Sequence, residues 1–128
     1  MADIQEGVIP RRDVLLVDDD LTFLETFGAL LRRAGYAVST EFTEVGGLAH
    51  LSTHMPDILI TDLRLGDGDG WQLVRYARAR QPALPVVVVT GWSYAVDMAG
   101  DYDRVAVFEK PFDPDVLLNY LDTLRVSG

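Results

Sequence analysis

Five short runs with strand character recur along the chain, and segments with helical spacing follow them. The runs cover residues 14–17, 36–40, 58–61, 86–89 and 105–108. Short, continuous apolar runs such as 14–17 and 86–89 are typical of strands that are buried on both faces of a parallel sheet. Between the runs, apolar residues recur near every 3.6 positions, which indicates amphipathic helices. This alternation predicts an α/β fold, with a five-stranded parallel, doubly wound sheet and right-handed crossovers.

The predicted helices cover 21–34, 44–54, 71–80 and 113–124, and they differ in strength. The first is strongly periodic and stops at Gly35, a residue common at helix ends. In the last helix, Asp113 serves as the cap and the inward side chains are Val116, Leu117, Tyr120, Leu121 and Leu124. Residues 92–103 have an ambiguous pattern that allows about two helical turns.

The helix over 44–54 has the weakest pattern of these. Gly46 and Gly47 each lower its intrinsic stability by about 1 kcal/mol relative to alanine. Tertiary packing therefore has to hold this helix, through the apolar side chains of Val45, Leu48 and Leu51. His50 and His54 lie on it and at its end, and we expect both at the surface.

Composition narrows the chemistry that this fold can carry. The chain has no cysteine and two histidines, so a metal ion has to bind to carboxylate and carbonyl oxygens, as Mg²⁺ and Mn²⁺ do. With 20 acidic and 11 basic residues the net charge is −9, which argues against direct nucleic-acid binding. No apolar run approaches membrane-spanning length and no secretory signal is present, so we expect a cytoplasmic protein.

Residues 1–12 are mixed and polar, which indicates a loose N-terminal arm that leads into the fold. We expect one domain over 13–125. The sequence after the last helix leaves no room for an output domain, so we expect none in this chain. The glycine- and aspartate-rich segment Gly66–Gly70 indicates a turn, because a calcium loop there would need acidic ligands where Leu65 and Tyr76 stand.

Functional side chains stand where four of the predicted strands end. Asp18 and Asp19 follow the first strand, Asp62 the third, Thr90 ends the fourth, and Lys110 follows the fifth. In an open parallel sheet these ends share one edge, where ligands bind. Carboxylates that are this close repel one another unless a cation joins them. A divalent ion, an ammonium and a hydroxyl together suit a phosphoryl group, which indicates phosphoryl transfer with Asp62 as the acceptor.

With these motifs in order, the chain strongly resembles the receiver domain of two-component response regulators. The segments that carry the resemblance are Leu16–Asp20, Ile60–Leu65, Asp69–Gly70, Val89–Gly91 and Glu109–Phe112. The resemblance covers about residues 13–125. It implies a flavodoxin-like (βα)₅ fold with strand order 2-1-3-4-5.

The resemblance also implies a role for each residue. Asp62 takes a phosphoryl group from a histidine kinase or a histidine phosphotransfer protein. Asp18 and Asp19 hold Mg²⁺, or Mn²⁺, together with Asp62 and the backbone carbonyl of Arg64. Of the phosphoryl-binding and switch residues Thr90, Gly91 and Lys110, the lysine pairs with Asp62 or the phosphoryl group, and it precedes a commonly cis peptide bond.

The same family predicts a regulatory module rather than an enzyme with a separate substrate. Its own phosphorylation and dephosphorylation are its only chemistry, and the result is altered binding of a downstream protein or phosphorylation-dependent homodimerisation.

Departures from the family pattern include a short span between Thr90 and Lys110, the turn after Asp62 and the fifth strand. Leu65-Gly66 stands where the turn after Asp62 usually has a proline, which favours a more flexible loop. Val107 stands where the family often has a switching aromatic, and strand alternation should turn the adjacent Phe108 to the other face of the sheet. Trp92, Val107 and Phe108 are therefore the candidates for the output surface.

Two other functions remain open on the sequence. Asp18-Asp19-Asp20-Leu21-Thr22 also fits the nucleophile motif of haloacid-dehalogenase-like phosphatases, with Asp18 as the nucleophile. That alternative leaves Asp62 without a role and lacks a later acidic pair. The second is a receiver-like binding module that is never phosphorylated, although such modules usually lose an acidic residue, the threonine or the lysine. Asp20 is best explained as a helix cap.

Overall fold

In a computed structural model of the chain, residues 12–91 and 104–127 are described. Five strands form the main sheet: β1 (Asp13–Val17), β2 (Ala37–Glu41), β3 (Ile58–Thr61), β6 (Val86–Thr90) and β7 (Val105–Glu109). The helices are α2 (Leu21–Arg33), α3 (Glu44–Thr53), α4 (Gly70–Arg80) and α6 (Pro114–Ser127). A small second sheet consists of β4 (Arg64–Leu65) and β5 (Gly68–Asp69).

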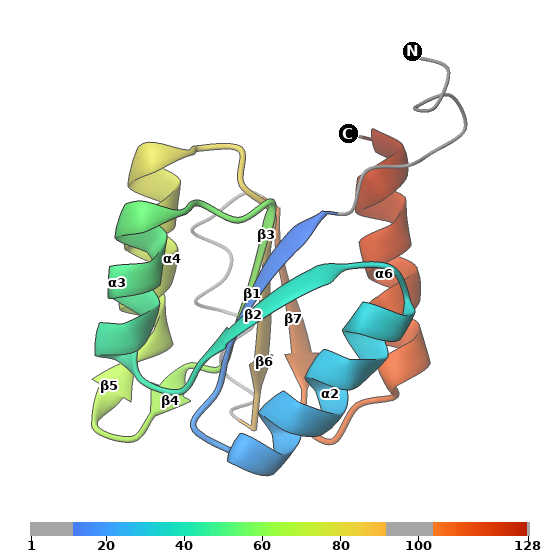
Figure 1. Cartoon of the computed structure of the whole chain (residues 1–128), viewed down its shortest axis with the longest axis horizontal. Coiled ribbons are helices and arrows are strands. Elements are labelled where there is room, and N and C mark those ends of the chain that lie inside the picture. The colour runs from blue at the N-terminus through green and yellow to red at the C-terminus, as the bar shows by residue number, and fades with distance from the viewer. Residues whose placement is uncertain (1–11, 92–103, 128) are drawn as a thin grey trace.

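The sheet is parallel throughout and its order is β2-β1-β3-β6-β7, which confirms the predicted fold class and strand order. Helices α3 and α4 cover one face of the sheet, and α2 and α6 cover the other (Figure 1). All five strands run in the same direction, so their carboxyl ends lie at one edge.

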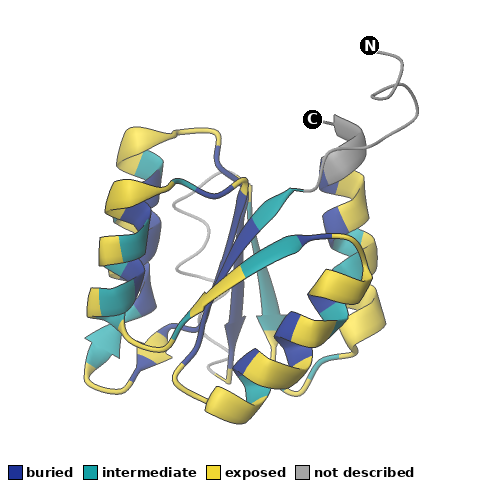
Figure 2. Cartoon of the chain, in the orientation of Figure 1, coloured by how far each residue is buried: buried dark blue, intermediate teal, exposed yellow. Residues whose placement is uncertain are grey.

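Alternate residues of each central strand enter two different cores. From β1, Leu15 and Val17 face α3 and α4, whereas Val14 and Leu16 face α2 and α6. These strand residues are almost completely buried (Figure 2). A fully buried aliphatic side chain stabilises a fold by about 1.5–3 kcal/mol, so the two cores fix the sheet and the positions of its strand ends.

Side chains at the carboxyl edge also start the helices. Asp20 accepts a hydrogen bond from the amide of Phe23 at 3.2 Å and caps α2, as predicted. Thr43 caps α3 in the same way, through the amide of Gly46. Asp69 caps α4 by accepting from the amide of Trp71 at 2.9 Å. Each cap satisfies an amide that lacks a partner within its helix.

Two predictions of inward-facing residues are wrong. Val45 is 77% exposed and Val116 is 55% exposed. Leu48 and Leu51 do pack inward from α3, as predicted. Helix α3 is also held by the close approach of Gly47 to Leu73, where an added Cβ would lie 2.9 Å from Cδ2. One glycine that weakens the helix is therefore needed for its packing.

The turn after Asp62 is a short antiparallel hairpin rather than an open loop. Arg64 pairs with Asp69 and Leu65 with Gly68. Gly66 begins the connection with φ +65°, a conformation that glycine adopts readily and most other residues do not. The turn that lacks the usual proline is therefore ordered by the pairing of β4 with β5.

Some predictions lie outside the described residues, namely the arm up to residue 11, the segment 92–103 and with it Trp92. The last helix begins after Asp113, as predicted, and continues to Ser127, beyond the expected end at Leu124. None of the helices in the described part of the chain is long and apolar enough to cross a membrane.

Candidate functional site

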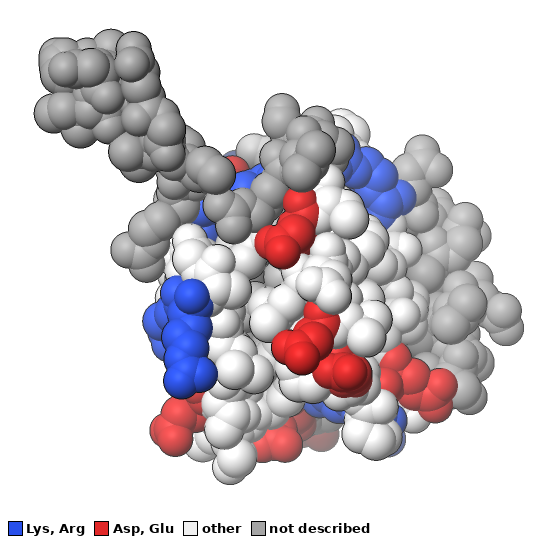
Figure 3. Space-filling model, turned by 90° about the vertical axis from the view of Figure 1, so that its right-hand side faces the viewer, with Lys and Arg blue, Asp and Glu red and all other residues white. Residues whose placement is uncertain are grey.

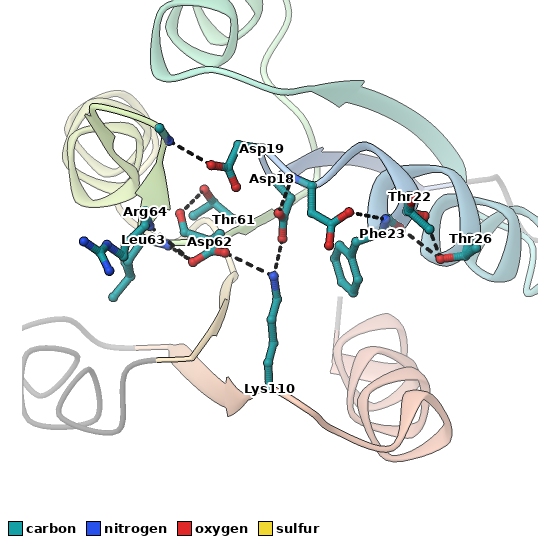
Figure 4. A network of polar contacts seen from close by, with 12 residues as sticks. Asp18, Asp19, Thr22, Phe23, Thr26, Thr61, Asp62, Leu63, Arg64 and Lys110 are labelled. Carbon is teal, nitrogen blue, oxygen red and sulfur yellow. Dashed lines mark hydrogen bonds and ion pairs between the residues drawn. The ribbon is translucent and has the colours of Figure 1, made fainter.

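Asp18 and Asp19 follow β1 directly, and they differ in exposure. Asp18 is fully buried, its amide donates to the carbonyl of Glu41, and its Oδ1 accepts from the amide of Asp20 at 2.9 Å. Asp19 is exposed, and its Oδ2 accepts from the amide of Gly66 at 3.0 Å (Figure 4). The backbone therefore directs both carboxylates at the carboxyl edge of the sheet.

Asp62 follows β3 and is 8% exposed. Its amide continues the pairing of β3 with β1 by donating to the carbonyl of Val17 at 3.0 Å. Its Oδ1 accepts from the amides of Leu63 at 2.6 Å and Arg64 at 3.2 Å. The carboxylate is thus held by the start of the hairpin, on the side away from Lys110 (Figure 4).

Gly70 packs directly behind Asp62. Its amide donates to the carbonyl of Leu63 at 2.9 Å. A Cβ at this position would lie 1.9 Å from the carbonyl oxygen of Asp62, which is far inside van der Waals contact. Glycine at the start of α4 therefore lets the helix approach Asp62, which gives a physical reason for the Asp69-Gly70 motif.

Lys110 reaches the same site from the end of β7. Its Nζ donates to Oδ2 of Asp18 at 2.6 Å and to Oδ2 of Asp62 at 3.1 Å. Its amide donates to the carbonyl of Thr90 at 2.8 Å, and the Lys110-Pro111 peptide bond is cis, as the resemblance implied. The ammonium also lies 4.6 Å from the centroid of the Phe23 ring.

Burial governs the electrostatics of the pair formed by Asp18 and Lys110. Burial raises the pKa of Asp18 above its ordinary value, and the hydrogen bond from Lys110 only partly offsets this. Burial alone would lower the pKa of Lys110, but the hydrogen bond and charge of Asp18 and the charge of Asp62 together raise it. The net effect raises the pKa of Lys110, so the lysine keeps its charge at neutral pH.

Oxygen atoms from Asp18, Asp19 and Asp62 lie within 4.8 Å of one another. Carboxylate oxygens in such a group suit a hard divalent cation, and Mg²⁺ typically binds to one or two carboxylates and keeps several waters. Two of these carboxylates, Asp18 and Asp62, share the ammonium of Lys110, and the third, Asp19, accepts from the amide of Gly66. The residues present therefore fit a divalent ion.

The remaining predicted site residues occupy the same edge or its neighbourhood. Thr90, at the end of β6, is 1% exposed and pairs in register with Glu109. Gly91 is exposed, and among the described residues nothing lies within 4 Å of a Cβ built there. Val107 packs into the core under α3 and α4, whereas Phe108 packs into the core under α2 and α6, so the predicted opposite orientation is confirmed.

The sequence did not predict two contacts of this site, which are made by Phe23 and Gly66. The ring of Phe23, on α2, lies under the ammonium of Lys110. Gly66 was noted for a missing proline, but its amide holds Asp19. A glycine at a proline position was a signal that a donor N–H had been gained there.

An apolar groove adjoins the site beside Lys110, with a volume of about 440 Å³. Its walls are Phe23, Thr26, Phe27, Leu30, Lys110, Pro111, Phe112 and Pro114. The face of the molecule that carries α2 and α6 is largely uncharged, with scattered acidic and basic side chains (Figure 3). The site therefore has an acidic side and an apolar side.

Comparisons with known proteins agree with this geometry. A model of the response regulator receiver domain family matches residues 14–122. Over 111 residues the chain is 36% identical to the transcriptional regulatory protein GlrR of Escherichia coli, covering 85% of this chain and 25% of that protein. The acid tolerance regulatory protein ActR of Sinorhizobium medicae is 33% identical over 114 residues, which are 85% of this chain and 57% of ActR.

Solved structures give the same result. A response regulator receiver protein from Sinorhizobium medicae superposes with a TM-score of 0.82 at 27% identity, over 90% of this chain and 94% of that one. A CheY-like receiver domain protein from Methanospirillum hungatei gives 0.81 at 25% identity, over 92% and 96% of the two chains. The chain spans about a quarter to just over half of the curated relatives named above. With the family match covering most of its length, this chain belongs to the response regulator receiver domain family.

Proposed function

We propose that Asp62 accepts a phosphoryl group from a histidine kinase or a histidine phosphotransfer protein, in a reaction that requires Mg²⁺. The observation that carries this proposal is the convergence of Asp18, Asp62 and Lys110 within direct hydrogen-bonding distance at the end of three strands. Family membership supports it, because receiver domains are regulatory modules that act in signal transduction.

In the proposed transfer, a carboxylate oxygen of Asp62 forms a bond to phosphorus and the phosphorus–nitrogen bond of the donor phosphohistidine breaks. The electron pair of that bond stays on the donor imidazole. Such reactions depend on in-line positioning and on neutralising charge, more than on covalent chemistry by the protein. The amides of Leu63 and Arg64 position the acceptor, and Lys110 is placed to follow the charge onto the phosphoryl oxygens.

Asp18, Asp19, Asp62 and the backbone carbonyl of Arg64 would hold the Mg²⁺ ion. When bound, the ion neutralises the carboxylates and the phosphoryl oxygens as charge moves between them. Thr90 and Gly91 would contact the phosphoryl group, since they end the neighbouring strand at the same edge. Phosphorylation would then change the binding of a downstream partner.

The relatives GlrR and ActR are named as regulatory proteins, and GlrR as a transcriptional one. We therefore infer that the phosphoryl signal of this domain serves gene regulation, through an attached or a separate output protein. Within the described residues the acidic site offers no basic surface for nucleic acid, so the domain itself would act through protein contacts.

A phosphorylation assay tests the acceptor. The protein is incubated with Mg²⁺ and acetyl phosphate, and the mass of the intact chain is measured. The wild type should gain one acid-labile phosphoryl group, and Asp62→Asn should gain none.

The two alternatives give different results in the same assay. A phosphatase that uses Asp18 as its nucleophile would tolerate Asp62→Asn and lose its modification in Asp18→Asn. A module that only binds partners would remain unmodified in every variant. Either result would reject the proposed function.

A further inference from the structure

Asp19 is the exposed member of the acidic cluster, and its orientation depends on one backbone group. In the described part of the chain, the two ion pairs of Lys110 go to Asp18 and Asp62. Asp19 instead accepts from the amide of Gly66, at 3.0 Å from its Oδ2, across 47 positions of sequence. An exposed carboxylate without such a partner samples several rotamers, and fixing it costs conformational entropy.

The position of this amide favours glycine for a backbone reason. Gly66 has φ +65°, and nothing lies within 4 Å of a Cβ built on it, so side-chain space is not the constraint. Proline, which stands at this place in many receiver domains, has φ near −65° and no N–H. The hydrogen bond to Asp19 is therefore one that the usual residue cannot make.

The hairpin that carries Gly66 is anchored on its far side. The amide of Asp69 donates to Oε1 of Glu44, at the start of α3, at 2.7 Å. Gly68 lies against the same side chain, since an added Cβ would be 2.7 Å from Cβ of Glu44. The cross-strand pair of Leu65 with Gly68 transmits this anchor to the turn.

From this geometry we propose that the β4–β5 hairpin is a positioning element of the cation site, and that the Gly66 amide orients the Asp19 carboxylate for a divalent ion. A hydrogen bond from an amide to a carboxylate is charge-assisted and directional. Groups that orient a metal ligand in this way typically change metal affinity about 10–100-fold when they are removed. This inference rests on the proposed function, because it concerns the Mg²⁺ ion that the acidic cluster would hold.

The experiment measures the dissociation constant for Mg²⁺ by NMR titration of the unphosphorylated protein, with four glycine variants and wild type as the set. Gly66→Pro removes the N–H and should weaken Mg²⁺ binding about 10-fold or more. Gly66→Asn keeps the N–H and tolerates positive φ, so it should bind Mg²⁺ as wild type does. Gly66→Ala keeps the N–H in a strained backbone and should fall between the two.

Gly35→Ala is the matched control. Gly35 also has positive φ, at 102°, but it lies at the end of α2 and donates to the carbonyl of Arg32. This variant should lose stability as Gly66→Ala does and keep wild-type Mg²⁺ affinity. The comparison separates general strain from loss of the contact with Asp19.

Glu44→Ala provides a second route if Gly66→Pro fails to fold. It removes the anchor of the hairpin without touching the acidic cluster, and should weaken Mg²⁺ binding a few-fold. The amide resonance of Gly66 should shift during the wild-type titration with the same midpoint as Asp19.

The outcomes separate the two proposals. If wild type binds no Mg²⁺, the cation part of the proposed function fails, and this inference fails with it. If wild type binds Mg²⁺ and both Gly66→Pro and Glu44→Ala bind it equally well, the hairpin has no positioning role and the proposed function stands.

Discussion

The acidic site has two walls that hold its carboxylates by different means. On one wall, Lys110 donates to Asp18 and Asp62 with a side chain that rests on Phe23. On the other wall, the hairpin donates the backbone amide of Arg64 to Asp62 and that of Gly66 to Asp19. The first wall brings a full charge with an adaptable side chain, and the second brings partial charges at fixed positions.

The difference separates two roles in the site. A lysine that bridges two carboxylates can move when the charge distribution changes, because its side chain has several rotatable bonds. Backbone amides in a paired hairpin cannot move far without breaking the pairing. We infer that the hairpin fixes the orientation of the Asp62 and Asp19 carboxylates and that Lys110 can adjust to their charge. Variants on the hairpin wall should therefore change the packing and geometry of the site, whereas variants on the lysine wall should change its electrostatics.

The largest effect is expected on the hairpin side, from Gly70→Ala. The new Cβ would lie 1.9 Å from the Asp62 carbonyl oxygen, and a rigid backbone cannot yield there. Overpacking against such a group should lower the free energy of unfolding by about 3 kcal/mol. Urea denaturation measures this loss.

Gly91→Ala is the control for that measurement. Among the described residues nothing lies within 4 Å of its built Cβ, so its stability should stay within about 0.5 kcal/mol of wild type. If Gly70→Ala is equally stable, the close approach of α4 to the acceptor does not constrain the fold.

On the opposite wall, Lys110→Met should lower stability by about 2 kcal/mol at neutral pH, because it leaves buried carboxylates without their cation. The effect is smaller than for a fully buried pair, since the Lys110 side chain is 27% exposed. The pKa of Lys110 is raised above 10.5, so its contribution is complete below that pH and is lost as pH rises through the folded-state pKa.

Denaturation curves at a series of alkaline pH values test this dependence. Wild type should lose part of its stability above pH 10.5, whereas Lys110→Met should lack that component. Parallel alkaline curves for the two proteins would show that the lysine does not stabilise the cluster.

Asp18→Asn should stabilise the protein by about 1 kcal/mol at neutral pH in the absence of Mg²⁺, as substitutions that relieve functional constraints often do. The folded-state pKa of Asp18 is raised above 3.8, so the folded chain holds the proton more tightly than the unfolded chain. Stability therefore falls as pH rises through this interval, and the penalty persists at neutral pH. The variant should lack that fall.

Thermal unfolding with and without Mg²⁺ completes the test of Asp18. Wild type should be stabilised by the ion, because a ligand that binds only the folded state adds to its stability. The asparagine variant should respond much less. A variant less stable than wild type without Mg²⁺ would mean that the ion pair with Lys110 outweighs the burial of Asp18.

The smallest effect is expected from Phe23→Leu, which removes the ring beneath Lys110. A cation–π contact at a partly exposed position contributes about 0.5–1 kcal/mol. The ε-methylene protons of Lys110 should lose their ring-current shift in this variant, and Phe23→Tyr should retain it. Unchanged proton shifts in Phe23→Leu would show that the ring does not contact the lysine in solution.

The sequence predicted the sheet well because both faces of its central strands are buried. A continuous apolar run such as 86–89 is typical of a strand in a sheet that is covered on both faces. The strand ends then placed Asp18, Asp62, Thr90 and Lys110 at one edge, and the structure has them there. The order of the strands and the positions of their ends were therefore enough to predict that these four residues lie at one edge of the sheet.

Helix faces were harder to predict. Val45 and Val116 fit the apolar spacing of their helices, yet both point to solvent, because which face of a short helix is buried depends on its tertiary neighbours. Gly47 had been counted against α3, although the contact with Leu73 needs it. The low helix propensity of glycine suggested that Gly47 destabilises α3, whereas its small size allows the helix to pack against Leu73.

The partners of two contacts between distant elements could not be identified from residue types alone. The hydrogen bond from the Gly66 amide to Asp19 depends on the turn conformation of the β4–β5 hairpin. The two residues are also 47 positions apart in sequence, so no local pattern indicates the contact. Phe23 reaches Lys110 because the cis Lys110-Pro111 loop and α2 meet in space. Both are properties of the assembled fold.

Chemical localisation of the phosphoryl group tests the central claim most directly. The protein is phosphorylated with acetyl phosphate and Mg²⁺, reduced with borohydride to convert an acyl phosphate to homoserine, and mapped by peptide mass spectrometry. Homoserine should be found at position 62 and at no other aspartate. Homoserine at position 18, or its absence from every peptide of a chain shown to be folded, would contradict the assignment of Asp62 as the phosphoryl acceptor.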